Sequence, residues 1–203
     1  MRVGRRPATA VAVAIALAGT FAVPAGAQDT TAFHELATEL AGAYALEADH
    51  HLVIVPHPAL GLFSLFDLEA GLARPLEQVD AAGGAVDSTI TFVYGPNVTA
   101  VSPVEGRITF VRGDEGVVNR LLWSRDGEEP QLGRRAPLRR EPVRFTNGDQ
   151  AELAGWLITP PTDGPHPVAV ILQPGTNDRF AMWRTAMALA VEGIGVLVFD
   201  RRD

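Results

Sequence analysis

The stretch Val168-Ala169-Val170-Ile171-Leu172 decides the fold expected for the last third of the chain. It is an unbroken apolar run rich in β-branched residues, which is typical of a strand covered on both faces, as in a parallel sheet. A second such run, Ile194–Phe199, lies beyond a segment with one apolar stripe at helical spacing (Met182, Trp183, Ala186, Leu189, Ala190). Gly193 stands where a helix commonly ends in the left-handed conformation. Residues 168–199 therefore predict a strand–helix–strand unit with a right-handed crossover.

Two more strands are expected before this unit. Val143-Arg144-Phe145 and Ala151–Ile158 flank the turn residues Asn147-Gly148-Asp149, a pattern that predicts a hairpin. This order of elements opens an α/β domain at 141–203, and the sequence stops directly after its fourth strand. We therefore expect Val196–Phe199 to be left as an unpaired apolar edge through which the protein can self-associate.

The ordered series resembles the start of an α/β-hydrolase catalytic domain, in particular exported bacterial hydrolases related to dienelactone hydrolases and serine aminopeptidases. The residues that carry the resemblance are Val143-Arg144-Phe145 with Asn147-Gly148, Leu153-Ala154-Gly155-Trp156-Leu157, Pro160, Pro167–Leu172, Gln173–Arg179 and Gly193–Arg202. The resemblance implies an α/β fold of which this chain holds strands 1–4. It also implies a serine-type hydrolase of ester, thioester or peptide bonds, with a small-molecule or peptide substrate and no cofactor.

The resemblance points to one loop of the catalytic site. In the family, the loop after the third strand supplies a backbone N–H group to the oxyanion hole, which stabilises the negative charge of the tetrahedral intermediate. Here the family's histidine is absent and Pro174 has no N–H, so Gly175, Thr176 and Asn177 are the candidate donors. The alternative is a plain connection from strand to helix. Asp200 matches the family's Asp-x-Arg, to which the resemblance gives a loop-shaping role.

The other catalytic parts of a serine hydrolase are missing. No Gly-x-Ser-x-Gly nucleophile elbow occurs, and the serines lack flanking glycines and a credible neighbouring base (Ser64, Ser88, Ser102, Ser124). His166 precedes the third strand, whereas the histidine of a triad follows late in the domain. We therefore expect an N-terminal fragment that is inactive by itself.

A metal site is not expected either. His50 and His51 are adjacent, and adjacent strand residues point to opposite faces. Neither Asp49 nor His57 completes a ligand spacing typical of zinc, and the chain has no cysteine.

Residues 28–140 predict a short helix and a β-rich accessory domain followed by a linker. The helix is expected at Thr31–Gly42 from its apolar spacing. Seven short β-type runs follow, separated by Gly-, Asn- and Asp-containing turns: Ala43–Leu46, His51–Val55, Gly61–Phe66, Leu72–Leu76, Ile90–Tyr94, Arg107–Arg112 and Val117–Trp123. Their even spacing predicts a small, mainly antiparallel sheet, half-barrel or sandwich. Gln131–Arg140, with its two arginine pairs, predicts a solvated linker, the alternative being an anion site.

The N-terminus and the composition bear on location and partners. Residues 1–27 have the arginines, apolar run and small-residue end of a signal peptide, which predicts a secreted or periplasmic protein without a stable membrane span. A net charge of −7 argues against nucleic-acid binding. A second function thus stays open beside the hydrolase: a non-catalytic, extracytoplasmic β-rich binding module with a vestigial α/β segment.

Overall fold

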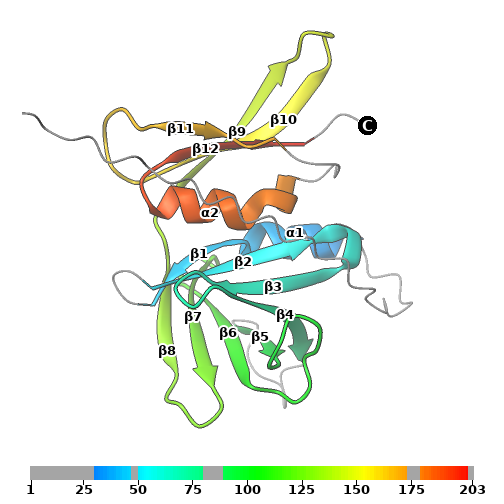
Figure 1. Ribbon diagram of the computed structural model, residues 1–203, viewed down its shortest axis with the longest axis vertical. Coiled ribbons are helices and arrows are strands. Elements are labelled where there is room, and N and C mark those ends of the chain that lie inside the picture. The colour runs from blue at the N-terminus through cyan, green and yellow to red at the C-terminus, as the bar shows by residue number, and fades with distance from the viewer. Residues whose placement is uncertain (1–29, 47–49, 80–88, 173–178, 201–203) are drawn as a thin grey trace, which may run out of the picture.

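The computed structural model describes residues 30–46, 50–79, 89–172 and 179–200. About half of them form β-strands, and the first eight strands close into one antiparallel barrel (Figure 1). The barrel strands are β1 (Gly42–Ala45), β2 (His51–His57), β3 (Leu62–Asp67), β4 (Leu72–Val79), β5 (Thr89–Tyr94), β6 (Gly106–Arg112), β7 (Val118–Arg125) and β8 (Gln131–Arg135). Each strand pairs with the next, and β8 returns to β1 through Tyr44↔Arg135 and Ala45↔Arg134.

Alternation along the strands fills the barrel with side chains. In β6, Ile108 and Phe110 point inward and are fully buried, whereas Arg107 between Gly106 and Ile108 is exposed. This two-residue period is what a sheet with one apolar face requires. The interior is therefore a packed core rather than a channel, as expected for a barrel of eight strands.

One end of the barrel is covered by α1 (Thr30–Leu40), with the 3-10 turn η1 (Pro58–Leu60) beside it. Leu40 is fully buried in the barrel core, and the rings of Phe33 and Phe63 lie 5.0 Å apart. Glu39 and Arg112, at the end of β6, form an ion pair of 2.7 Å. These contacts anchor the helix over this end and leave the opposite end without it.

The remaining strands form a second, four-stranded sheet in the order β11-β12-β10-β9. They are β9 (Arg139–Thr146), β10 (Glu152–Thr159), β11 (Val168–Val170) and β12 (Gly195–Phe199). Between β11 and β12 the chain forms the 3-10 turn η2 (Arg179–Met182) and α2 (Trp183–Val191). β11 and β12 are parallel, which confirms the predicted strand–helix–strand pairing, and the other pairs are antiparallel.

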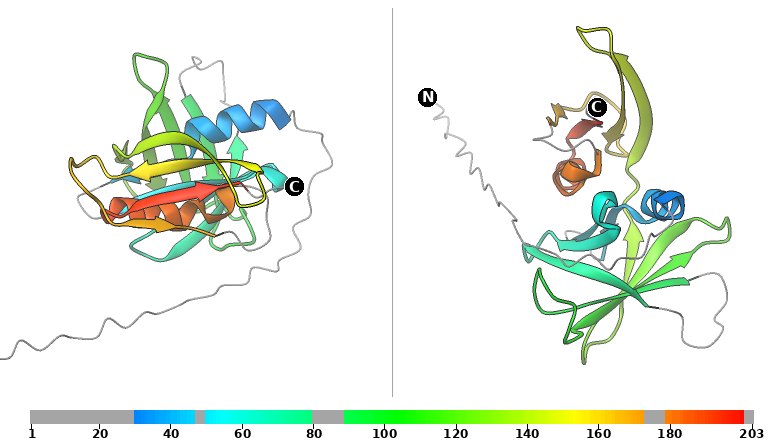
Figure 2. Two further views of the ribbon diagram at one scale, coloured as in Figure 1. Left: turned by 90° about the horizontal axis from the view of Figure 1, so that it is seen from above. Right: turned by 90° about the vertical axis from the view of Figure 1, so that its right-hand side faces the viewer.

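A second core joins this sheet to the barrel. Figures 1 and 2 show α2 between the sheet and strands β1 and β2. The outward-facing Val53 and Val55 of β2 share one buried cluster with Trp183 and Met187 of α2. The Arg140 guanidinium lies 5.3 Å from the ring centroid of Trp156 and 6.0 Å from that of Trp183. Burial lowers the pKa of Arg140 to about 10, which still leaves it charged at neutral pH.

The α/β fold class expected from the sequence is wrong. The strands predicted between 43 and 123 are confirmed, but they belong to a closed barrel that dominates a mainly β chain. The linker predicted at 131–140 is also wrong, since β8 lies there and closes the barrel. Its Arg135 donates to the hydroxyl of Tyr44, so it is not a solvated charge.

The predicted unpaired edge is wrong as well. β12 is hydrogen-bonded on both sides, by β10 and by β11, so Val196–Phe199 offers no edge for self-association. The short strand β11 lies at the edge of the described sheet instead, with Val168 and Val170 both more than half exposed. Neither α-helix of the described residues is long and apolar enough to cross a bilayer.

Candidate binding site at the open end of the barrel

A cavity of about 450 Å³ opens at the barrel end opposite α1. It is formed where β3 turns into β4, where β5 ends and β6 begins, and where β7 turns into β8. Its lining combines two buried aromatic rings, two leucines, two arginines and four carboxylates: Tyr94, Trp123, Leu65, Leu72, Arg74, Arg125, Asp67, Glu105, Asp126 and Glu128. The mouth of a β-barrel is a common place for a small-molecule site.

The floor of the cavity is a hydrogen-bonded aromatic pair. Trp123 Nε1 donates to the Tyr94 hydroxyl oxygen at 2.9 Å, and that hydroxyl donates to the carbonyl of Ser124 at 3.3 Å. Both rings are less than 5% exposed, and burial raises the pKa of Tyr94. Gly106 makes this packing possible, because a Cβ there would lie only 2.2 Å from the tyrosine oxygen. Burial and these hydrogen bonds therefore hold the two rings in place at the floor of the cavity.

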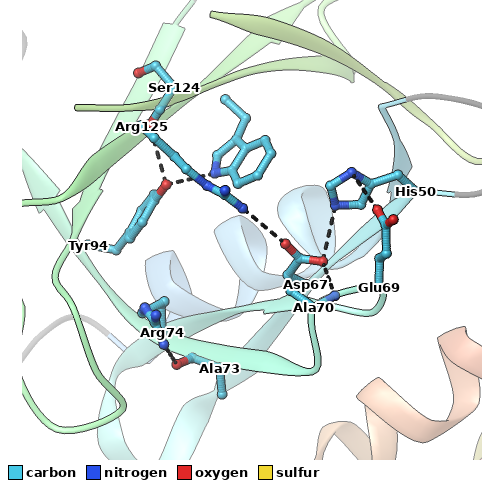
Figure 3. Close-up of polar contacts among 10 residues, drawn as sticks. His50, Asp67, Glu69, Ala70, Ala73, Arg74, Tyr94, Ser124 and Arg125 are labelled. Atoms are coloured by element: carbon cyan, nitrogen blue, oxygen red, sulfur yellow. Dashed lines mark hydrogen bonds and ion pairs between the residues drawn. The ribbon is translucent and has the colours of Figure 1, made fainter. Parts of the chain in front are cut away.

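Asp67, at the end of β3, is the only charged side chain in the buried set of described residues, with 5% exposure. Its Oδ1 accepts hydrogen bonds from the Ala70 amide at 3.0 Å and from His50 Nε2 at 3.1 Å (Figure 3). Its Oδ2 accepts no hydrogen bond from any described residue. The nearest cation is Arg125, whose Nη2 lies 3.5 Å away as an ion pair. One buried oxygen facing the cavity therefore lacks the donor that such an atom normally has.

His50 holds the carboxylate in place. Its Nδ1 lies 3.2 Å from Glu69 Oε2, and its ring meets Trp123 edge-on at 5.7 Å between centroids. The imidazole thus bridges the carboxylates of Asp67 and Glu69 (Figure 3) and contacts the ring of Trp123. This arrangement fixes the orientation of Asp67 from behind and leaves Oδ2 on the cavity side.

Two arginines line the cavity. The Arg125 guanidinium lies over the face of Trp123, 4.5 Å from the ring centroid, and its side chain is 43% exposed. Arg74, on β4, donates from Nη1 to the carbonyl of Ala73 at 3.0 Å. Glu105, Asp126 and Glu128 are exposed around the opening. Four carboxylates against two guanidinium groups give the lining a charge of −2, so its field favours a cation over an anion.

The residues predicted as a site from the sequence lie elsewhere. Gly175, Thr176 and Asn177 fall within 173–178, outside the described residues. The Asp200 amide donates to the carbonyl of Ala154, and His166 Nε2 donates to the carbonyl of Thr162 within its own loop. No group of histidine and carboxylate side chains suited to a metal ion occurs in the described part of the chain.

One serine does have a histidine beside it, contrary to the expectation from the sequence. His57 Nε2 lies 3.0 Å from Ser64 Oγ, on the outer surface of β2 and β3. Burial lowers the pKa of His57, so the imidazole is neutral at neutral pH. Within the described residues no carboxylate orients the other ring nitrogen, as a serine nucleophile's histidine requires. The pair is a cross-strand hydrogen bond rather than a triad.

The residues of the cavity were missed because they were treated only as strand or turn residues. A signal was nevertheless present for Asp67. It follows Phe63 and Leu65 at two-residue spacing, so alternation places its carboxylate on the core face of the strand. A charged residue on a core face calls for an explanation, and here that explanation is the cavity. Trp123 and Arg125 have the same two-residue spacing, which places them on one face of a strand, but the spacing does not indicate that the guanidinium stacks on the ring.

Comparison with known proteins finds no matching family model, no similar curated protein and no similar solved structure. The resemblance to α/β-hydrolases is wrong, because the fold differs from the one that it implies. The chain is a closed antiparallel barrel joined to a small mixed sheet, and neither its fold nor any family match supports a hydrolase.

Proposed function

We propose that this chain is a ligand-binding module that holds a small polar molecule in the open end of its barrel. The single observation that carries the proposal is Asp67, a carboxylate almost wholly buried at the cavity, with one oxygen that accepts no hydrogen bond from the described residues. Leaving such an atom unsatisfied costs about 1–3 kcal/mol, and more for a charged group. A bound donor would recover that free energy.

The rest of the lining suits the same role. Eight-stranded barrels are just wide enough to be filled by side chains or to hold one small ligand. Here side chains fill the middle and the α1 end, and the space remains at the other end. Location outside the cytoplasm is part of the proposal, and it rests on the signal-peptide pattern of residues 1–27.

The test uses a matched pair of tryptophan substitutions. Leu72 lies on the cavity wall and is 42% exposed, whereas Leu132 lies on the outer surface of β8 and is 41% exposed. Leu72→Trp would fill part of the cavity, and Leu132→Trp adds the same bulk outside it. Ligand-observed NMR with small charged and neutral molecules would be run on the wild-type protein and both variants.

We expect at least one molecule to bind the wild-type protein and Leu132→Trp, and to lose binding to Leu72→Trp. Equal binding to all three proteins would place the site elsewhere. A complete absence of binding across the panel would also overturn the proposal. Far-UV circular dichroism of each variant checks that the barrel is folded.

A further inference from the structure

Resting on the proposed function, we infer that the ligand is a small monovalent organic cation, a primary ammonium or a guanidinium. It would displace the Arg125 side chain and take over its contacts with the face of Trp123 and the carboxylate of Asp67, beside the Tyr94 hydroxyl with which Arg125 also interacts. Arg125 would then be a built-in occupant of the site that moves aside when the ligand enters.

The first step of the argument is that the site is already shaped for a cation. An aromatic face with a carboxylate beside it attracts a positive group through the ring quadrupole and through charge. The Arg125 guanidinium occupies this position, 4.5 Å from the Trp123 centroid and 3.5 Å from Asp67 Oδ2. Figure 3 shows the Arg125 side chain reaching toward Asp67.

The second step is that Arg125 satisfies the carboxylate only in part. Its approach to Oδ2 gives no hydrogen bond, although arginine can donate to a carboxylate through two parallel N–H groups. The backbone position of Arg125 explains this. Arg125 is the last residue of β7, and with its guanidinium stacked on Trp123 its Nη2 comes only to 3.5 Å from Oδ2. A free cation without this tether can stack on the ring and donate to Oδ2 at hydrogen-bond distance.

The third step is that Arg125 can leave. Its side chain is 43% exposed, and Asp126 and Gly127 of the following turn are exposed as well. The swing into solvent would not open the barrel core, because Trp123 keeps its hydrogen bond to the Tyr94 hydroxyl and its neighbours in the core. Leu65 and Leu72 would receive the ligand's hydrocarbon part.

The fourth step concerns the choice between a cation and an anion. Arg74 and Arg125 could in principle hold an anion between them. However, an anion would have to lie beside the unsatisfied oxygen of Asp67 and within a ring of three exposed carboxylates, Glu105, Asp126 and Glu128. Repulsion between charges of like sign disfavours an anion there. The rim instead raises the local concentration of cations.

The experiment compares four probes that share a four-carbon chain: n-butylammonium, n-butylguanidinium, butyrate and n-butanol. Dissociation constants are measured by ligand-observed NMR on the wild-type protein, Arg125→Ala, Arg107→Ala, Asp67→Asn and Leu72→Trp. Arg107 is the matched control, because it is an exposed arginine at the same end of the barrel but on its outer surface. Asp67→Asn keeps the shape and the Oδ1 acceptor but removes the charge.

We expect both cations to bind the wild-type protein more tightly than butyrate and butanol. Arg125→Ala should bind them about tenfold more tightly, because no resident cation competes. Arg107→Ala should match the wild-type protein, and Asp67→Asn should lose the preference for cations. If Asp67→Asn fails to fold, the comparison of Arg125→Ala with Arg107→Ala still decides.

Weaker or unchanged cation binding in Arg125→Ala would overturn the inference. Tighter binding of butyrate or butanol than of the two cations would also overturn the inference. If the binding of butyrate or butanol were lost in Leu72→Trp, the proposed binding function would survive and only the cation inference would fail. If no probe is sensitive to Leu72→Trp, both fail. The two proposals are thus separated by the same set of proteins.

Discussion

Substitution of Gly106 by alanine should destabilise the protein strongly, through the floor of the cavity. The new Cβ would lie 2.2 Å from the Tyr94 hydroxyl oxygen, 2.3 Å from Tyr94 Cζ and 2.5 Å from the carbonyl oxygen of Ser124. None of these atoms is the free end of a flexible chain, since the ring is buried and the carbonyl belongs to β7. The tyrosine must therefore move, and its hydrogen bonds with Trp123 and with Ser124 break.

The size of the effect follows from these contacts. Overpacking costs about 1–3 kcal/mol and each lost hydrogen bond about 1 kcal/mol, so Gly106→Ala should lower the free energy of unfolding by roughly 3–5 kcal/mol. The assay is urea unfolding followed by tryptophan fluorescence. Gly148→Ala is the control: a Cβ there meets nothing within 4 Å, so its effect should be small. A loss below about 1 kcal/mol in Gly106→Ala would refute the reasoning, because overpacking alone should exceed it.

Three further predictions concern other parts of the molecule. Trp183→Ala should cost about 3–5 kcal/mol in urea unfolding, because the fully buried ring joins α2 to the barrel; a cost near zero would mean that the two do not pack. His57 has a lowered pKa, so its contribution to stability is present above the unfolded value of 6.5 and is lost as pH falls below it. In His57→Gln the melting temperature should therefore fall less steeply as pH is lowered below 6.5 than it does in the wild-type protein. The same pH dependence in both proteins would contradict this. Val170→Lys should reduce light scattering at high concentration, because a lysine on the exposed strand β11 opposes pairing between copies; Glu192→Lys, on an exposed helix end, should leave scattering unchanged.

The strands were predictable because turn residues punctuate the sequence at short, even intervals. β6 and β7, for example, lie within a residue or two of the expected ranges. Closure of the barrel was not predictable, since β8 reads Gln-Leu-Gly-Arg-Arg and its polar character indicates a linker. Its partner β1 is about ninety residues away, and only tertiary contacts such as that of Arg135 with Tyr44 bring them together.

The prediction for the second sheet was wrong for a different reason. The apolar runs correctly indicated a parallel pair, but apolar runs do not determine the order of the strands in the sheet. β12 inserts between β11 and β10, so the strand expected at the edge lies inside the sheet. For the cavity, alternation alone marks Asp67 as a charge on the core face. The stacking of Arg125 on Trp123 depends on side-chain geometry that no local pattern encodes.

The most direct test of the central claim is a backbone-amide NMR shift map of the wild-type protein during titration with n-butylguanidinium. We expect the shifting amides to cluster at Asp67–Arg74, Tyr94, Gly106 and Trp123–Glu128, the segments that meet at the open end of the barrel. Shifts centred on α1 and the neighbouring Arg112 end, on the four-stranded sheet, or nowhere, would contradict the claim that this end of the barrel is a binding site.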